Sequence, residues 1–202
     1  SNNGVAIFFV DTQMTLFTAC GILNAQKANT VITPAVCEAY IEWLFTQIDK
    51  KKRGFDKCWI RELSELNARR APGNTCITAL NNILAGLEPN NNSKGCGGVM
   101  RIAPIPLYGA VDNRMDIKEV CRVAAEVSEL THQHPLGYIP SALVAYIIYR
   151  LAQDESPKRE VYKEYIQEGL AFVAEMYAEY ADEVVLFSRL IKTAILWSDI
   201  ST

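Results

Sequence analysis

Residues 11–27 read DTQMTLFTACGILNAQK, and they carry the pattern that decides the fold class of this chain. Small and apolar residues recur at intervals that place them on one side of a helix: Met14, Phe17, Gly21 and Ile22. Such spacing is typical of a helix that buries one side. Asp11 or Thr12 can cap its first turn, because a short oxygen-bearing side chain accepts a hydrogen bond from an unpaired amide there.

The rest of the chain repeats this spacing, whereas one short run, residues 5–10, has the β-branched and aromatic character of a strand. We therefore predict an all-α fold. Asn74, Asp116 and Ser156 are predicted helix caps, Gly86 a helix end, and the asparagine-rich residues 88–94 a surface loop. Further helices are expected at about residues 33–48, 75–85, 99–108, 116–130, 136–153, 157–180 and 182–197.

The chain has 202 residues, 50% of them hydrophobic, which is enough to bury one sizeable core. We expect one domain over residues 1–202. The net charge of −3 gives no general attraction to nucleic acid, and the basic run at residues 50–53 is expected to be a solvated loop. No apolar stretch approaches the ~20 residues of a membrane span, and the start of the chain lacks the basic residues of a signal peptide, so we expect a soluble, cytoplasmic protein.

The six cysteines show no C-x-x-C pair and no accompanying histidine cluster. This pattern indicates neither a zinc site nor a disulfide framework, and we expect reduced thiols.

Residues 93–100, which we call the glycine loop, contain three glycines in a four-residue window: Gly95, Gly97 and Gly98. Glycine allows close backbone approach and positive φ, and free amides before a helix attract phosphate oxygens. The loop therefore predicts a phosphate-bearing ligand. The alternative is a turn that only packs helices together.

Three other positions could carry chemistry. Asp11 either caps its helix or points into a site, and both histidines of the chain, His132 and His134, precede a long apolar helix. Histidines two residues apart cannot share a helix face, so we expect no metal site there; the alternative is one locally bonded and one exposed imidazole. Glu38 and Glu42 are expected to mark a solvated helix face.

Four separated motifs together resemble the ADP-ribosylglycohydrolase family, in the same order. They are DTQMTLF at residues 11–17, RAPGNTC at residues 70–76, SKGCGGVMRIAP at residues 93–104, and THQHPLG at residues 131–137. The resemblance implies an all-α fold, a single-domain orthogonal helical bundle. In this fold, loops around two magnesium ions bind ADP-ribose attached to a protein side chain, with arginine as the expected acceptor. Water then cleaves the glycosidic bond.

The resemblance also implies roles for particular residues. Asp11 matches a metal-binding aspartate of the family and is the expected catalytic and metal-ligating residue. His132 matches a histidine of the nucleotide pocket, with His134 and Tyr138 as neighbours. The loop that wraps the ribose and pyrophosphate is matched by Ser93, Gly95, Cys96, Gly97, Gly98, Val99 and Met100.

The chain departs from the family pattern at the expected metal ligands. Phe9 and Val10 stand where the family has a hydroxyl residue and an aspartate, and the C-terminal Asp-x-Asp motif has no match. Magnesium requires oxygen ligands, which valine cannot supply. The chain is a piece of a longer protein, lacks short internal segments, or belongs to a member that has lost catalysis; we favour the first explanation.

The functional hypotheses are therefore three. The first is a magnesium-dependent hydrolase that releases ADP-ribose from a protein side chain. The second is a catalytically silent binder of ADP-ribose or a related nucleotide, and the third is a helical structural protein with neither activity. The sequence leaves the oligomeric state open.

Overall fold

The computed structural model describes residues 9–48, 57–158 and 160–200, and every regular element in them is helical. The α-helices are α1 (Val10–Ala28), α2 (Ile32–Ile48), α3 (Asn74–Leu84), α4 (Pro104–Ala110), α5 (Ile117–Glu129), α6 (Pro135–Gln153), α7 (Val161–Met176) and α8 (Ala181–Ile200). Short 3₁₀ turns lie between them: η1 (Trp59–Glu62), η2 (Ser64–Leu66), η3 (Val99–Arg101), η4 (Val111–Asn113) and η5 (Ala178–Tyr180). The predicted all-α class is confirmed.

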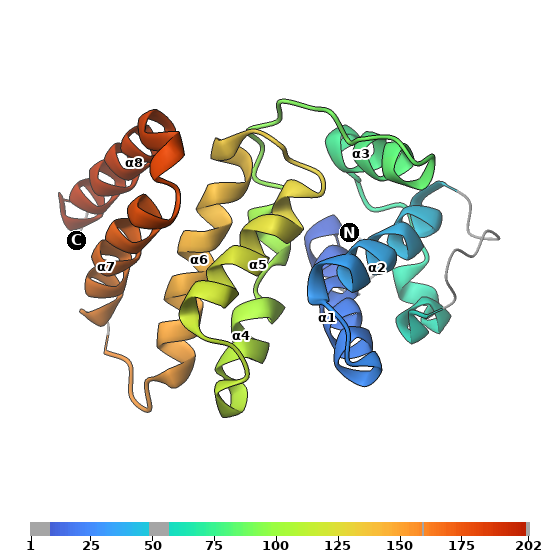
Figure 1. Ribbon diagram of the computed structural model, residues 1–202, viewed down its shortest axis with the longest axis horizontal. Coiled ribbons are helices and arrows are strands. Elements are labelled where there is room, and N and C mark those ends of the chain that lie inside the picture. The colour runs from blue at the N-terminus through green and yellow to red at the C-terminus, as the bar shows by residue number, and fades with distance from the viewer. Residues whose placement is uncertain (1–8, 49–56, 159, 201–202) are drawn as a thin grey trace.

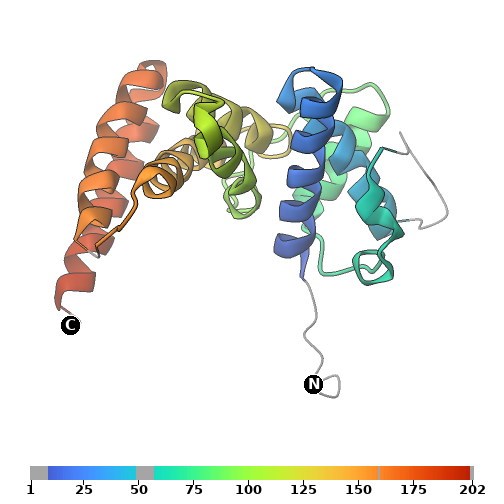
Figure 2. The same cartoon turned by 90° about the horizontal axis from the view of Figure 1, so that it is seen from below.

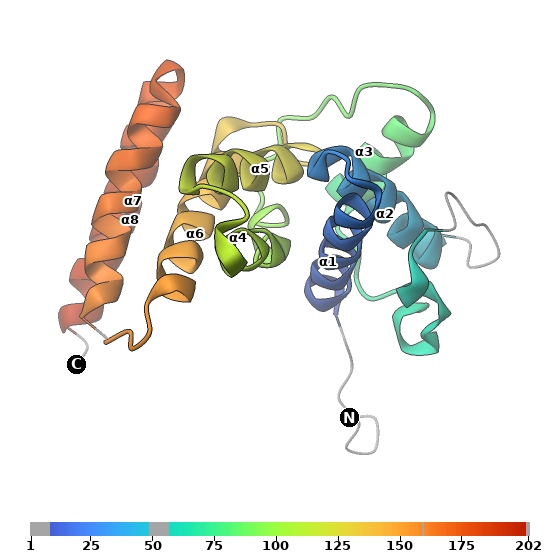
Figure 3. The same ribbon diagram turned by 60° about the horizontal axis from the view of Figure 1, so that its bottom comes forward.

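The helices form three groups along the long axis of the molecule (Figure 1). α1, α2 and α3 lie at one end, α4, α5 and α6 in the middle, and the antiparallel pair α7 and α8 at the other end, an order that the rotated views preserve (Figures 2 and 3). One apolar core joins the first group to α5, and a second joins α5 and α6 to α7 and α8. α5 and α6 contribute to both cores, so the middle group holds the molecule together.

α1 buries the side that its sequence pattern predicts. Met14 and Phe17 are completely buried, and a Cβ on Gly21 would lie 2.6 Å from the Val36 Cα, so glycine permits the close contact between α1 and α2. The predicted cap is wrong, however. Asp11 lies within the first turn, as does Thr12, and Phe9 occupies the cap position without any side-chain hydrogen bond.

The strand expected over residues 5–10 falls largely outside the described residues. Val10, its last member, is the first residue of α1. Local β propensity is a weak signal there, because the helical pattern that follows begins immediately.

Other helix boundaries follow the predictions closely. Asp116 caps α5 by accepting a hydrogen bond from the Glu119 amide at 2.8 Å. Gly86 ends the α3 segment with a φ of 73°, the left-handed conformation that favours glycine. Asn74 is wrong as a cap, because it is the first residue of α3 and Gly73 holds the cap position.

Two expected helices are shorter or divided. The segment 99–108 is split into η3 and α4, with Pro104 at the start of α4, because proline cannot continue the hydrogen-bond ladder of a helix. α7 begins at Val161, so Ser156 does not cap it; its amide instead donates to the Asp154 carboxylate at 3.0 Å. The basic run at residues 50–53 lies outside the described residues.

The predicted solvated face of α2 is wrong for Glu42. Its side chain is completely buried and pairs with Arg61 of η1, whereas Glu38 is half-exposed and pairs with Lys57 at 2.8 Å. The face carrying Glu42 is covered by the segment after α2, which brings in the compensating charge.

All six cysteines are free thiols, as expected. One described helix, α6, has the length and apolar composition of a membrane span, contrary to the sequence expectation. Half of its apolar window is buried, and α4, α5, α7 and α8 all contact it. This is the environment of a core helix.

Candidate functional site

The glycine loop follows α3, includes the first two residues of η3 and lies partly at the surface. Its first residues, from Lys94 to Cys96, are exposed, Gly97 is half-buried and Gly98 is buried. The Gly95 amide donates to Ser93 Oγ at 3.3 Å, while the amides of Cys96 and Gly97 have no hydrogen-bond acceptor among the described residues. The loop therefore presents amide donors near the surface.

The three glycines serve different purposes. A Cβ on Gly97 would lie 2.8 Å from the His132 ring, and one on Gly98 would lie 2.8 Å from the Ser128 Cβ, so both are required for close packing. Gly95 would make only ordinary contacts, the nearest at 3.4 Å. None of the three has a positive φ, so their missing side chains, and not left-handed backbone, explain their packing. The helix-packing interpretation thus accounts for Gly97 and Gly98 and leaves Gly95 unexplained.

His132 and His134 differ in environment, but neither is the exposed imidazole that the sequence-based alternative expected. His134 caps α6, its Nδ1 accepting from the Leu136 amide at 3.0 Å. His132 is 3% exposed rather than solvated, because the glycine loop covers its ring. Burial, assisted by the charge of Arg101, lowers the pKa of His132 from 6.5 to about 4, so its imidazole is neutral near pH 7.

Two residues that sequence reasoning missed fasten the loop to the turn before α6. The Asn91 side chain donates to the Thr131 carbonyl at 3.0 Å, and its oxygen accepts from the Ser93 amide at 3.1 Å. Gln133 Oε1 in turn accepts a hydrogen bond from the backbone amide of Asn91 at 2.9 Å. The run of asparagines was a signal for a surface loop, but the partner of each amide depends on tertiary structure.

Arg101 and Thr131 form a second feature that the sequence did not reveal. The Arg101 side chain is completely buried, its guanidinium stacks 4.4 Å from the Tyr40 ring centre, and it donates to Thr131 Oγ1 at 2.6 Å. Thr131 Oγ1 in turn lies 2.8 Å from His132 Nδ1. A buried cation thus stands behind the imidazole that faces the loop.

The loop also reaches the start of α1. Thr15 Oγ1 lies 3.3 Å from the Met100 carbonyl and donates to the Asp11 carbonyl at 2.7 Å. Asp11 itself is exposed, and its carboxylate has no hydrogen bond or ion pair within the described ranges. The structure therefore brings the glycine loop, His132 and the first turns of α1 into one region.

Tyr138 lies elsewhere. Its buried ring faces Tyr177 and Tyr180 edge-on, with ring centres 6.3 Å apart in both pairs, in the core between α6, α7 and α8. Burial raises its pKa. Tyr138 therefore supports the packing of α6 rather than the loop.

The described residues do not fit the two-magnesium centre that the resemblance implies. Across residues 9–48, 57–158 and 160–200, no three histidine, cysteine, aspartate or glutamate side chains gather as metal ligands. Beside Asp11, Phe9 and Val10 offer no oxygen atom from their side chains. We therefore assign no chemical step to a metal ion in this part of the chain.

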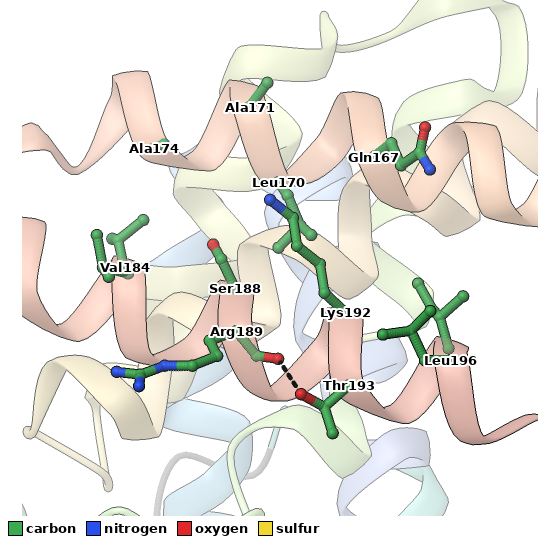
Figure 4. A pocket seen from close by; sticks show the side chains of 12 residues that line it. Gln167, Leu170, Ala171, Ala174, Val184, Ser188, Arg189, Lys192, Thr193 and Leu196 are labelled. Carbon is green, nitrogen blue, oxygen red and sulfur yellow. Dashed lines mark hydrogen bonds between the residues drawn. The ribbon is translucent and has the colours of Figure 1, made fainter.

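Cavities described in the structure lie away from the glycine loop. The space of about 990 Å³ between α7 and α8 is lined mainly by aliphatic side chains, together with Arg189 and Lys192 (Figure 4). A second of about 780 Å³ lies between the end of α1 and the start of α2, and a third of about 330 Å³ before α7. None of them contains a residue of the predicted site.

These observations define an all-α protein whose glycine-containing loop covers a neutral histidine and contacts α1, the helix that carries the exposed Asp11. The family model for ADP-ribosylglycohydrolase matches residues 8–198. The chain therefore belongs to the ADP-ribosylglycohydrolase family, whose members are hydrolases that act on ADP-ribosylated substrates. Searches of curated proteins and of solved structures find no match.

Proposed function

We propose that the glycine loop and His132 bind the ADP-ribose unit of an ADP-ribosylated protein, with arginine as the modified side chain, and that the chain acts in removing this unit. The observation that carries the proposal is the contact between segments that are distant in sequence: the glycine loop, the turn that holds His132, and the start of α1. The loop packs on His132 through Gly97 and contacts α1, one turn beyond Asp11, through Met100.

The charge around the loop suits a diphosphate. The sequence holds no acidic residue between Glu88 and Asp112, whereas Lys94 lies in the loop and the buried Arg101 follows it. The unpaired amides of Cys96 and Gly97 add hydrogen-bond donors, and oriented amides favour anions. The loop therefore combines one exposed basic side chain, Lys94, with free amide donors, and both favour binding of two negative phosphates.

Hydrolysis is the proposed outcome, and Asp11 would contribute an oxygen ligand if a magnesium ion were bound. In the family's chemistry such an ion supplies a polarised water molecule. The described residues do not complete its coordination, so the second candidate is a silent ADP-ribose binder. The apolar side chains of Phe9 and Val10 favour this second candidate.

Calorimetry with ADP-ribose, once with magnesium and once with a chelator, tests binding, and an arginine-ADP-ribosylated peptide tests turnover. We expect affinity in both conditions, because the proposed contacts come from amides and an imidazole. Release of ADP-ribose only with magnesium supports the hydrolase, and affinity without release supports the silent binder. Absence of binding in either condition contradicts the proposal and favours the purely structural protein.

Gly95 offers a test of the charge argument. A side chain fits there without a severe contact, so Gly95→Asp places a carboxylate in the loop and Gly95→Asn is its neutral counterpart. We expect Gly95→Asp to weaken ADP-ribose binding roughly tenfold more than Gly95→Asn, about 1.4 kcal/mol, with a smaller difference at high salt. Equal effects of the two variants would show that no anion lies beside the loop.

A further inference from the structure

The Arg101 guanidinium is a fixed hydrogen-bond donor in the interior. It can only donate, and its second amino group contacts the Val127 carbonyl at 3.1 Å and Thr131 Oγ1 at 2.6 Å. No carboxylate lies within ion-pair distance of it among the described residues. Its position is held by stacking on Tyr40 and by these acceptors.

This arrangement determines where the Thr131 proton goes. Thr131 is completely buried, and its hydroxyl oxygen has two described partners, Arg101 and His132. Because Arg101 donates, the oxygen accepts from it, and His132 Nδ1 at 2.8 Å is the acceptor available for the hydroxyl proton. If Nδ1 carried a proton instead, the buried hydroxyl would have no acceptor for its own proton, which is unfavourable in the interior.

A neutral imidazole carries one proton, so an accepting Nδ1 places that proton on Nε2. Nε2 is the ring nitrogen that faces the glycine loop: it would lie 2.9 Å from a Cβ on Gly97 and 3.5 Å from one on Gly95. Within the described part of the chain, Nε2 has no hydrogen-bond partner. The Nε2–H group of His132 is thus a hydrogen-bond donor that faces the loop and has no acceptor among the described residues.

We infer that Arg101 and Thr131 are positioning residues that hold His132 in its Nε2–H form, as a hydrogen-bond donor to a phosphate oxygen of the ligand lying over the glycine loop. The inference rests on the proposed function for the identity of that ligand. A phosphate oxygen fits because it accepts several hydrogen bonds at once, and the free amides of Cys96 and Gly97 are adjacent donors.

Long-range ¹H–¹⁵N spectra of the imidazole test the inference directly, since they distinguish the two neutral tautomers. We expect the Nε2–H form in the ligand-free protein at pH 7. Thr131→Val, which keeps the shape and removes the hydroxyl, is expected to lose this preference, and Thr131→Ser to retain it. The Nδ1–H form in the unmodified protein, or an Nε2–H form unchanged in Thr131→Val, overturns the inference. If Thr131→Val fails to fold, the tautomer of His132 in the unmodified protein and in Thr131→Ser still tests the inference.

Ligand titrations then identify the acceptor. We expect the His132 Nε2 resonance to move on adding ADP and not on adding adenosine, and Thr131→Val to weaken ADP-ribose binding about tenfold, with recovery in Thr131→Ser. A response to adenosine alone overturns the assignment to phosphate. An Nε2–H tautomer in a protein without affinity for ADP-ribose contradicts the proposed function and leaves the tautomer assignment standing.

Discussion

At the scale of single residues, the protonation of His132 depends on what covers its ring. The imidazole is enclosed by the glycine loop on one side and by Arg101 and Thr131 on the other. Solvent cannot stabilise its protonated form there, and the nearby guanidinium opposes it. The residue therefore works as a neutral hydrogen-bonding group rather than as a cation.

The pH dependence of stability should show this. The folded-state pKa of His132 is lowered to about 4, below the ordinary 6.5, so between these values the unfolded chain binds a proton that the folded chain does not. Stability should therefore fall as the pH drops from about 6.5 to about 4, with no further contribution outside this window. Urea unfolding at pH 7 and pH 5 measures it, and His132→Gln should lose less stability than the unmodified protein. Parallel losses would contradict the lowered pKa.

Gly97 offers a steric test of the same contact. Its missing side chain leaves room for the His132 ring, so the methyl group of Gly97→Ala must displace either the loop or the imidazole. Overpacking of this kind costs about 1–3 kcal/mol. We expect a lower melting temperature and weaker ADP-ribose binding. Gly73→Ala is the control, because a Cβ there meets nothing within 4 Å, and it should behave as the unmodified protein.

At the scale of elements, polar contacts attach the irregular segments to the helices. Gln13 of α1 donates to the carbonyls of Leu66 and Ala68 at 3.0 and 2.9 Å, and it accepts from Trp43 and Gln47 of α2. A glutamine in an apolar helix pattern thus serves as the anchor for residues 66–68. Buried amides of this kind fix one arrangement of neighbouring segments, because leaving any partner unpaired is unfavourable.

The ion pair of Glu42 with Arg61 should contribute strongly to the same attachment. Glu42→Gln removes a buried carboxylate facing a buried guanidinium, and breaking such a pair typically costs about 3–5 kcal/mol. Glu38→Gln removes the half-exposed partner of Lys57, and we expect a loss of less than about 1 kcal/mol. Denaturant unfolding of both variants provides the comparison. Similar small losses would show that the Glu42 pair is solvated in solution.

At the scale of the whole molecule, α7 and α8 contribute to the second core and not to the first. They share one core with α5 and α6, and among the described side chains of α8, Val184 is the one that is fully buried. Val185, Leu190 and Trp197 are more than half exposed. Elements with few buried side chains open at lower free energy than the global unfolding.

Gly169 tests this difference in stability. A Cβ there would lie 2.7 Å from Leu143 and 2.9 Å from Tyr146, so Gly169→Ala should loosen α7 from α6. We expect faster amide hydrogen exchange in α7 and α8 and unchanged exchange in α1 and α2. Gly86→Ala is unsuitable as a control because of its positive φ, whereas Gly73→Ala should leave all rates unchanged. Acceleration throughout the chain would show that the two cores unfold together.

Much of this architecture could be predicted from sequence because it depends on local spacing. The apolar period of residues 11–27 and the capping residue Asp116 each act within one or two helical turns. The four motifs placed the glycine loop and His132 in one family pattern, and the structure brings them into contact. The burial of Glu42 was not predictable, because its neutralising partner is 19 residues away in an irregular segment.

The amino-acid sequence by itself determined that this chain is helical and that it belongs with the ADP-ribosylglycohydrolases. It also determined that the glycine loop and His132 are part of the family pattern. Periodicity and motif order are properties of the linear chain, so they can be recognised from the sequence alone. Only the tertiary structure decided that Arg101 and Thr131 stand behind His132, and that two of the three loop glycines exist to let backbone and imidazole approach. Those facts depend on atoms that long stretches of chain separate, and a hydrogen bond is formed by distance and direction alone.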